Sequence, residues 1–202
     1  MADAPLPPAA PAAARPLPRA AQSKRPLVWL AIVCLAPFVA SFASYFWLVP
    51  TSRVNYGTLL GNRVLPDVPV TRLDGSIDPH PLRGKWALLV VDEGACAQAC
   101  AQKLYATRQA RTMQGKERDR VERIWLYTGD ARPAPELIAA HPDLAIARAV
   151  PDVVAALPDP DPAQAIWLVD PLGNLVLRYP ADPDIKRLHK DIARLLFASR
   201  IG

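Results

Sequence analysis

An uncharged run near the start of the chain constrains the fold most. Residues 27–49 contain no charged side chain, and a helix of about 20 apolar residues is enough to cross a bilayer. Pro37 lies inside the run, which membrane helices tolerate. Trp29 lies near one end and Tyr45–Trp47 near the other, as expected for an interfacial aromatic belt. We therefore predict one transmembrane helix over residues 27–49.

The segment before this run has a different composition. Residues 1–26 are rich in proline and alanine and have almost nothing to bury, which predicts a disordered arm. Basic residues precede the run, whereas only Arg53 directly follows it, so the positive-inside rule places the arm in the cytoplasm. We expect a bacterial inner-membrane protein with a periplasmic C-terminal domain. A signal peptide cleaved near Ala43 is the alternative, but the apolar run continues past that point.

The remainder is long enough for one domain. We predict a linker over residues 50–63 and a domain over residues 64–202. The net charge of +5 comes largely from the arm and from one helical stretch, so no nucleic-acid partner is expected. Paired cysteines persist as disulfides in an oxidising compartment such as the periplasm.

Two cysteines follow the most apolar strand of this domain. Trp86–Val91 is a buried strand by composition, and a proline-free stretch from Cys96 to Gln114 predicts a helix. Cys96 and Cys100 would lie on one helix face, one turn apart. Such a pair can close a disulfide, exchange electrons or hold a soft metal.

The other predicted elements alternate between strands and helices. Strands are predicted over residues 68–73, 123–128, 144–149, 165–170 and 175–179. Helices are predicted over residues 135–140, 152–157 and 185–197. Alternation followed by a closing hairpin predicts a mixed α/β sheet flanked by helices. A cysteine pair after the first core strand makes the thioredoxin-like fold the best candidate.

The cysteine segment and the hairpin resemble the Sco/SenC family. The resemblance rests on Gly84–Leu89, on Cys96 and Cys100, and on the hairpin Val169–Gly173. Members are membrane-anchored thioredoxin-like proteins that assist cytochrome c oxidase assembly, chiefly by copper delivery. The resemblance implies Cu(I) as a possible metal. It also implies a respiratory oxidase subunit or a copper chaperone as partner.

The chain departs from the family pattern around the metal. Ala97 and Ala101 stand where the family has proline. The family's third copper ligand is a histidine, and its place falls near Pro162, where residues 159–166 contain none. Of the domain's histidines, His141 is the leading substitute ligand, because loops after core strands gather at one edge of such folds. Each of the three, His80, His141 and His189, is nevertheless expected to be a solvated or packing residue.

Redox chemistry needs no histidine. A helix N-terminus stabilises a thiolate, so Cys96 would be the nucleophile and Cys100 the resolving partner. Asp92 and Glu93 would oppose this stabilisation, although either could relay a proton. One helical turn places the two Cα atoms about 6 Å apart, within disulfide range. A purely structural staple would gain little, because the closed loop is short.

A basic stretch and three tryptophans have simpler explanations. The basic residues are expected to form a solvated face interleaved with acids, whereas Trp86, Trp125 and Trp167 are expected in the core. Met113 is also expected in the core. The basic residues are Lys103, Arg108, Arg111, Lys116, Arg118, Arg120 and Arg123.

Three hypotheses follow from the sequence. The first is thiol–disulfide exchange by Cys96 and Cys100 on a copper protein or its chaperone. The second is Cu(I) carriage by the same pair, with a third ligand that the sequence does not assign. The third is a membrane-tethered assembly scaffold without chemistry of its own.

Overall fold

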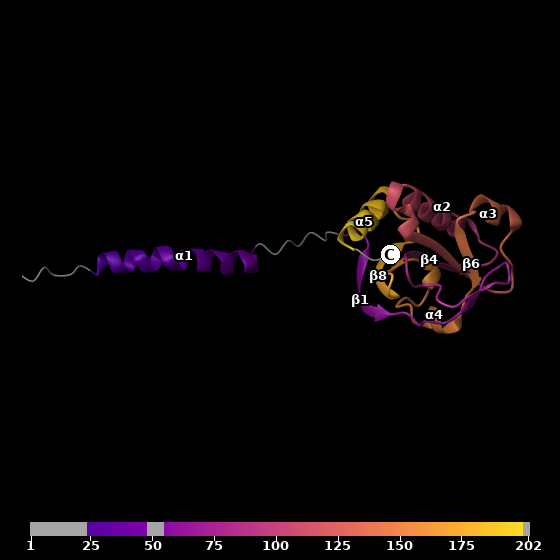
Figure 1. Cartoon of the computed structure of the whole chain (residues 1–202), viewed down its shortest axis with the longest axis horizontal. Helices are drawn as coiled ribbons and strands as arrows, with labels where there is room; N and C mark the ends of the chain where they lie inside the picture. Colours follow the sequence, from indigo (N-terminus) through magenta and orange to yellow (C-terminus); the bar gives the residue numbers. More distant parts are fainter. Residues whose placement is uncertain (1–23, 48–54, 200–202) are drawn as a thin grey trace, which may run out of the picture. The chain divides into compact units, whose positions relative to one another are not determined.

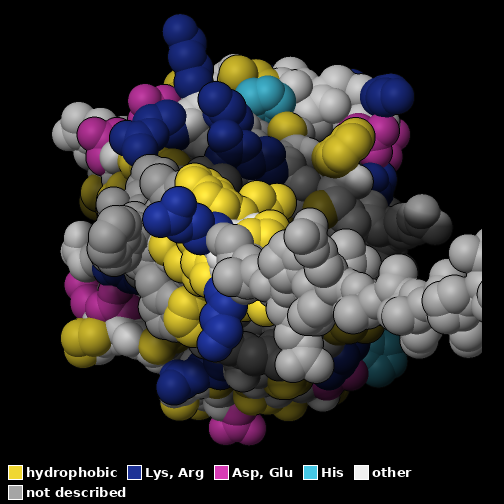
Figure 2. Space-filling model, turned by 90° about the vertical axis from the view of Figure 1, so that its left-hand side faces the viewer, with side chains coloured by type: hydrophobic (Ala, Val, Ile, Leu, Met, Phe, Trp, Pro, Cys, Tyr) yellow, Lys and Arg dark blue, Asp and Glu magenta, His cyan; other side chains and the backbone are white. Residues whose placement is uncertain are grey.

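The computed structural model describes residues 24–47 and 55–199. The chain divides into two compact units, before and after residue 53. In the first unit, helix α1 spans Arg25–Trp47 and contains Pro37. The large apolar side chains of α1 are exposed around the helix. Figure 2 looks along the helix axis and draws hydrophobic side chains in yellow. By length and composition α1 can cross a membrane. The predicted arm lies outside the described residues except for its last three, of which Arg25 and Pro26 are helical.

The second unit is built on a six-stranded mixed sheet. Its strand order is β1-β8-β7-β4-β5-β6, with β4, β5 and β6 parallel and the other neighbours antiparallel. The strands are β1 (Thr58–Val64), β4 (Trp86–Glu93), β5 (Val121–Thr128), β6 (Leu144–Arg148), β7 (Ala165–Val169) and β8 (Asn174–Pro180). A separate hairpin pairs β2 (Val70–Thr71) with β3 (Ile77–Asp78).

Helices cover both faces of this sheet (Figure 1). Helices α2 and α5 pack on one face, and α4 packs on the other. The helices are α2 (Gln98–Thr112), α3 (Pro135–Ala140), α4 (Pro151–Ala155) and α5 (Ile185–Ala198), and two 3₁₀ helices are η1 (Gly115–Arg120) and η2 (Pro162–Gln164). This is the α/β thioredoxin-like architecture that the element order predicted.

The central strand explains why the sheet is buried on both faces. Trp86–Val91 of β4 is buried throughout. Alternate residues face opposite layers, so Leu88 packs with α2 and α5, whereas Leu89 packs with the α4 layer. A strand enclosed in this way needs the nearly continuous apolar run that the sequence shows. Trp86, Trp125 and Trp167 are core residues, as predicted.

The closing hairpin follows its predicted turn. Asp170 and Asn174 pair through the Asp170 N–H, which donates to the Asn174 carbonyl at 2.9 Å. Gly173 has φ +85°, a conformation that glycine adopts at no steric cost. The turn therefore fixes the antiparallel register of β7 and β8.

Three local predictions were wrong. The predicted linker over residues 50–63 includes strand β1, which pairs its backbone with β8 at the sheet edge despite Gly61 in its centre. Met113 is not in the core, because it caps the C-terminus of α2 and is 42% exposed. The helix after β4 begins at Gln98, not at Cys96, because a turn intervenes.

Candidate functional site

The cysteine pair lies where the parallel strands β4 and β5 end. The chain leaves β4 through Gly94, whose N–H donates to the Thr128 carbonyl at 3.0 Å and so continues the strand pairing. A Cβ on Gly94 would lie 1.9 Å from the Ala131 carbonyl oxygen. Glycine is therefore required here, because the loop after β5 passes directly against this backbone.

A tight turn brings the two cysteines together. The Cys96 N–H donates to the Glu93 carbonyl at 3.0 Å, and Cys96 itself has φ +44°. Cys96 therefore precedes the N-cap residue Ala97, whereas Cys100 lies in the first turn of α2. The two residues form a disulfide with their Cα atoms 5.1 Å apart. The predicted proximity is correct, but a turn brings Cys96 into place, not a helix face.

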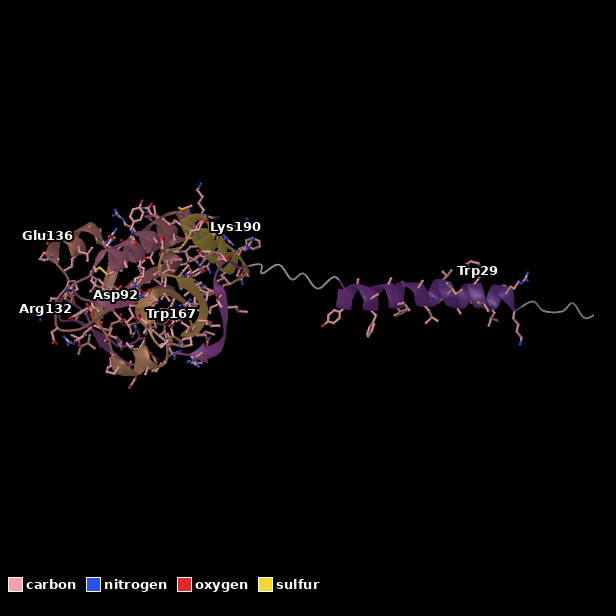
Figure 3. The ribbon with its side chains drawn as sticks, turned by 180° about the vertical axis from the view of Figure 1, so that it is seen from behind. Trp29, Asp92, Arg132, Glu136, Trp167 and Lys190 are labelled. Atoms are coloured by element: carbon pink, nitrogen blue, oxygen red, sulfur yellow. A yellow bond between two sulfur atoms is a disulfide. The ribbon has the colours of Figure 1, made fainter. Side chains whose placement is uncertain are left out.

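The two halves of the disulfide differ in solvent exposure. Cys100 is 1% exposed and belongs to the core under α2, whereas Cys96 is half-buried. Figure 3 shows the disulfide in yellow near Asp92. A partner can therefore approach the pair from the Cys96 side, and both residues lie at the positive N-terminal end of α2.

A buried ion pair adjoins the disulfide. Lys103 follows Cys100 by one helical turn and is 1% exposed. Its Nζ lies 2.5 Å from Asp92 Oδ2 and also donates to the Ala163 carbonyl in η2. One ammonium thus joins the end of β4, helix α2 and the loop before β7. Asp92 was predicted to oppose the stabilisation of a Cys96 thiolate. Its negative charge is balanced, because the Lys103 ammonium lies beside it.

The burial of Lys103 was not predicted from the sequence, which placed this residue on a solvated face. Lys103 is preceded by Cys100 and followed by Leu104 and Thr107, all of which are buried on the same side of α2. The available signal was the spacing of Lys103, three residues after Cys100 and four before Thr107. A basic residue within a buried stripe needs a buried partner, and Asp92 after the strand was the nearest candidate.

A second buried cation binds the middle of α2. Arg123 is 0% exposed and was also predicted to be solvated. Its guanidinium donates to the Leu104 carbonyl at 2.7 Å, to Thr107 Oγ1 at 3.2 Å and to Asp143 Oδ1 at 2.9 Å. Burial lowers the pKa of Arg123 to about 10, against the raising effect of Asp143.

His141 belongs to this second network. It is 7% exposed, and its Nδ1 lies 3.3 Å from Arg123 Nη2. Burial, with the nearby Arg123 charge, lowers the pKa of His141. The neutral ring therefore accepts from Arg123 through Nδ1 in the arrangement that the geometry favours. His141, the predicted substitute metal ligand, thus has its Nδ1 hydrogen-bonded to the Arg123 guanidinium.

The remaining histidines are also separate from the disulfide. His80 lies at the surface, with its Nδ1 3.1 Å from Asp67 Oδ2. His189 lies on α5. Within residues 24–47 and 55–199, no three His, Cys, Asp or Glu side chains gather in a way that could hold a metal ion. Among the described residues, the two cysteines thus supply only two of the donors that a three-ligand copper site needs.

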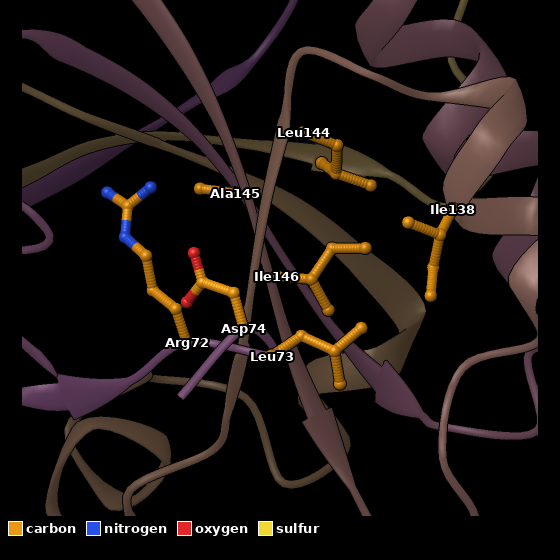
Figure 4. Close-up of a pocket in the computed structure, with 7 residues that line it drawn as sticks. All are labelled: Arg72, Leu73, Asp74, Ile138, Leu144, Ala145 and Ile146. Atoms are coloured by element: carbon orange, nitrogen blue, oxygen red, sulfur yellow. The ribbon is translucent and has the colours of Figure 1, made fainter. Parts of the chain in front are cut away.

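A surface hollow lies elsewhere in the domain (Figure 4). It has a volume of about 380 Å³ and is formed by the segment after β2, helix α3 and strand β6. Its lining residues are Arg72, Leu73, Asp74, Ile138, Leu144, Ala145 and Ile146. Neither a cysteine nor a histidine contributes, so the hollow carries none of the predicted chemistry.

Comparison with known families assigns the domain. The family described as "Transmembrane-like, thioredoxin-like, C-terminal domain" matches residues 86–199, which is more than half of the chain. The chain belongs to this family. The match runs from the first residue of β4 to the end of α5 and so includes both cysteines. No curated protein matches the sequence.

Solved structures of Sco proteins share the fold. Copper-bound ScoI from Bradyrhizobium japonicum has a TM-score of 0.52 at 18% identity, covering 65% of this chain and 98% of its own. Yeast Sco1 has a TM-score of 0.55 at 15% identity, with coverages of 67% and 99%. BsSco is a Sco-family cytochrome c oxidase assembly protein with a disulfide switch. It has a TM-score of 0.51 at 13% identity, with coverages of 73% and 97%. These likenesses show that the chain shares the fold of Sco proteins, which agrees with the thioredoxin-like description of the matched family.

Proposed function

We propose that this chain is a membrane-anchored, Sco-like protein that assists cytochrome c oxidase assembly by thiol–disulfide exchange. The observation that carries the proposal is the disulfide between half-buried Cys96 and buried Cys100, with the buried Lys103–Asp92 ion pair starting one helical turn after Cys100. Helix α1 would anchor the domain in the bacterial inner membrane, with residues 55–199 in the periplasm. The oxidase link is supported by the Sco neighbours, of which BsSco carries a disulfide switch.

The exchange runs through the more exposed cysteine. In the reduced protein, the Cys96 thiolate attacks one sulfur of a partner disulfide, and the partner's other sulfur leaves as a thiolate. The Cys100 thiolate then attacks Cys96 Sγ, which releases the second partner thiolate and closes the Cys96–Cys100 bond. Two electrons pass to the partner, and a periplasmic dithiol donor restores the reduced pair. The partner is a copper-handling protein or an oxidase subunit whose cysteines must be reduced.

The surroundings of the pair favour this chemistry. The N-terminal end of α2 stabilises a developing thiolate. Lys103, one helical turn after Cys100, adds a buried positive charge, and Asp92 holds that charge in place at 2.5 Å. Lys103 Nζ also donates to the Ala163 carbonyl. This hydrogen bond keeps the loop before β7 against the site.

Trapping tests the assignment of roles. A Cys100→Ser variant of the whole chain keeps the attacking thiol and loses the resolving one, so a mixed disulfide with the partner should accumulate in membranes. The adduct would appear on non-reducing gels as a band that dithiothreitol removes. Cys96→Ser is the matched control and should form none. Both variants carry Cys34→Ser, because Cys34 is a free thiol in α1. Equal trapping by the two variants, or by neither, would refute the exchange.

Cu(I) carriage by the same pair is the second candidate. Copper-bound Sco structures favour it, and two thiolates suit Cu(I). Against it, no third ligand gathers among the described residues. Titrating the reduced protein with Cu(I) beside Cys96→Ser/Cys100→Ser decides the matter, since uptake must depend on the cysteines. If that double variant still supports oxidase maturation, a scaffold role replaces both candidates.

A further inference from the structure

Helix α5 presents a basic outer face with one aromatic residue. Its inner face, Leu188, Ile192 and Leu196, is buried in the core. Its exposed side chains include Lys186, Arg187, Lys190, Arg194 and Phe197. The only acid within Ile185–Ala198 is Asp191, which is 2% exposed. Its Oδ1 lies 3.8 Å from Arg194 Nη1 and offsets that charge in part, so the positive charge of the face comes mainly from Lys186, Arg187 and Lys190.

Phe197 breaks the polar pattern of this outer face. It is 95% exposed, although burying a phenylalanine side chain is favourable. It borders a hollow of about 410 Å³ whose other lining residues include Lys116, Glu117 and Arg120 of η1, where Arg120 Nη1 lies 3.0 Å from Glu117 Oε2. An exposed aromatic side chain beside basic residues is typical of a surface that lies in a membrane interface.

The chain from α1 joins the domain on this same helix. The backbone N–H groups of Tyr56 and Gly57 donate to Asp191 Oδ2 at 2.8 and 2.9 Å. The Arg187 guanidinium lies 4.4 Å from the centre of the Tyr56 ring. Residues 48–54 connect α1 to this point, and seven residues can extend over roughly 25 Å at most. When α1 is in a membrane, its tether therefore keeps the attachment point on α5 within reach of the lipid surface.

We propose that the outer face of α5 binds the surface of an anionic phospholipid bilayer. Lys186, Lys190 and the neighbouring arginines would contact lipid phosphates, and Phe197 would enter the interface. This proposal rests on the membrane anchoring included in the proposed function. Figure 3 shows Lys190 on the side of the domain away from Arg132 and Glu136.

Amine labelling of the full chain in lipid nanodiscs tests the contact. One set of discs contains phosphatidylcholine alone, and another contains about equal amounts of phosphatidylcholine and phosphatidylglycerol. Acetylation of Lys186 and Lys190, followed by mass spectrometry, should be at least about threefold slower in the anionic discs, and high salt should restore the rate. Lys85, exposed at the start of β4, is the internal control and should react equally in both. Equal rates for Lys186 and Lys190 in both discs would overturn the proposal.

A variant separates lipid docking from other causes of protection. Phe197→Ser should reduce the protection of Lys190 in anionic discs without changing thermal stability, because the side chain is almost fully exposed. Ala198→Ser is the matched control and should keep the protection. Unchanged protection in Phe197→Ser would remove the aromatic contact from the proposal. Failure of the chain to enter discs would instead show that α1 is no anchor, which overturns the anchoring itself.

Discussion

Lys103 and Arg123 are two buried cations of the domain that differ in their partners. Both were predicted on a solvated face, and both are at most 1% exposed. Arg123 has a set of neutral acceptors in addition to Asp143, and it holds β5 to α2 at Leu104 and Thr107. Lys103 has one carboxylate and one carbonyl, and it lies one helical turn from Cys100.

The difference separates a structural role from a chemical one. The planar guanidinium of Arg123 fills several fixed hydrogen bonds, which suits a permanent anchor. The Lys103 ammonium is a compact charge that responds to a charge change beside it. Removing Arg123 should therefore affect stability most, whereas removing Lys103 should also affect the redox behaviour of the disulfide.

Loss of Arg123 should have the largest effect. Arg123→Met removes the buried cation from the Leu104 carbonyl and leaves Asp143 with Arg111 alone among the described cations, and it should lower the free energy of unfolding by about 3 kcal/mol. Urea unfolding followed by tryptophan fluorescence measures it. Arg108→Gln is the control, because Arg108 is exposed and contacts only the Ala140 carbonyl among the hydrogen bonds described; about 0.5 kcal/mol is expected there. Similar losses in both variants would contradict an anchoring role for Arg123.

Loss of Lys103 should affect the reduction potential. Lys103→Met should lower the free energy of unfolding by about 1–2 kcal/mol, less than Arg123→Met, because fewer hydrogen bonds are lost. It should also lower the reduction potential of the Cys96–Cys100 pair by about 30 mV, since the reduced thiolate loses a nearby cation. Asp92→Asn should shift the potential the opposite way. Equilibration with glutathione buffers measures both, and shifts of the same sign would contradict the electrostatic explanation.

A smaller effect is expected from pH through His141. Because burial and Arg123 lower the pKa of His141, the folded state resists the proton that the unfolded chain accepts near pH 6.5. Stability should therefore fall as pH decreases from about 6.5 towards the lowered folded pKa. His141→Gln should remove part of this slope in urea unfolding at several pH values. An identical slope in both proteins would show that His141 does not titrate across folding.

The sequence predicted most of the architecture because the core strands are strongly patterned. The unbroken apolar run in β4, the turn at Gly173 and the amphipathic repeat of α5 each predict one element through local physics. Strand β1 escaped prediction because its pairing depends on the free edge of β8, which no local pattern reports. The lysine and arginine next to the core escaped for a similar reason, since charged residues are usually solvated.

By itself, the sequence determined an apolar span and a thioredoxin-like domain with two adjacent cysteines, because periodicity and composition act over short distances. Only the tertiary structure decided the electrostatics of the site. It placed Asp92 beside Lys103, bound His141 to Arg123 and buried Cys100 more deeply than Cys96. These contacts join residues from different strands, helices and loops, so they exist only once the sheet has brought those elements together.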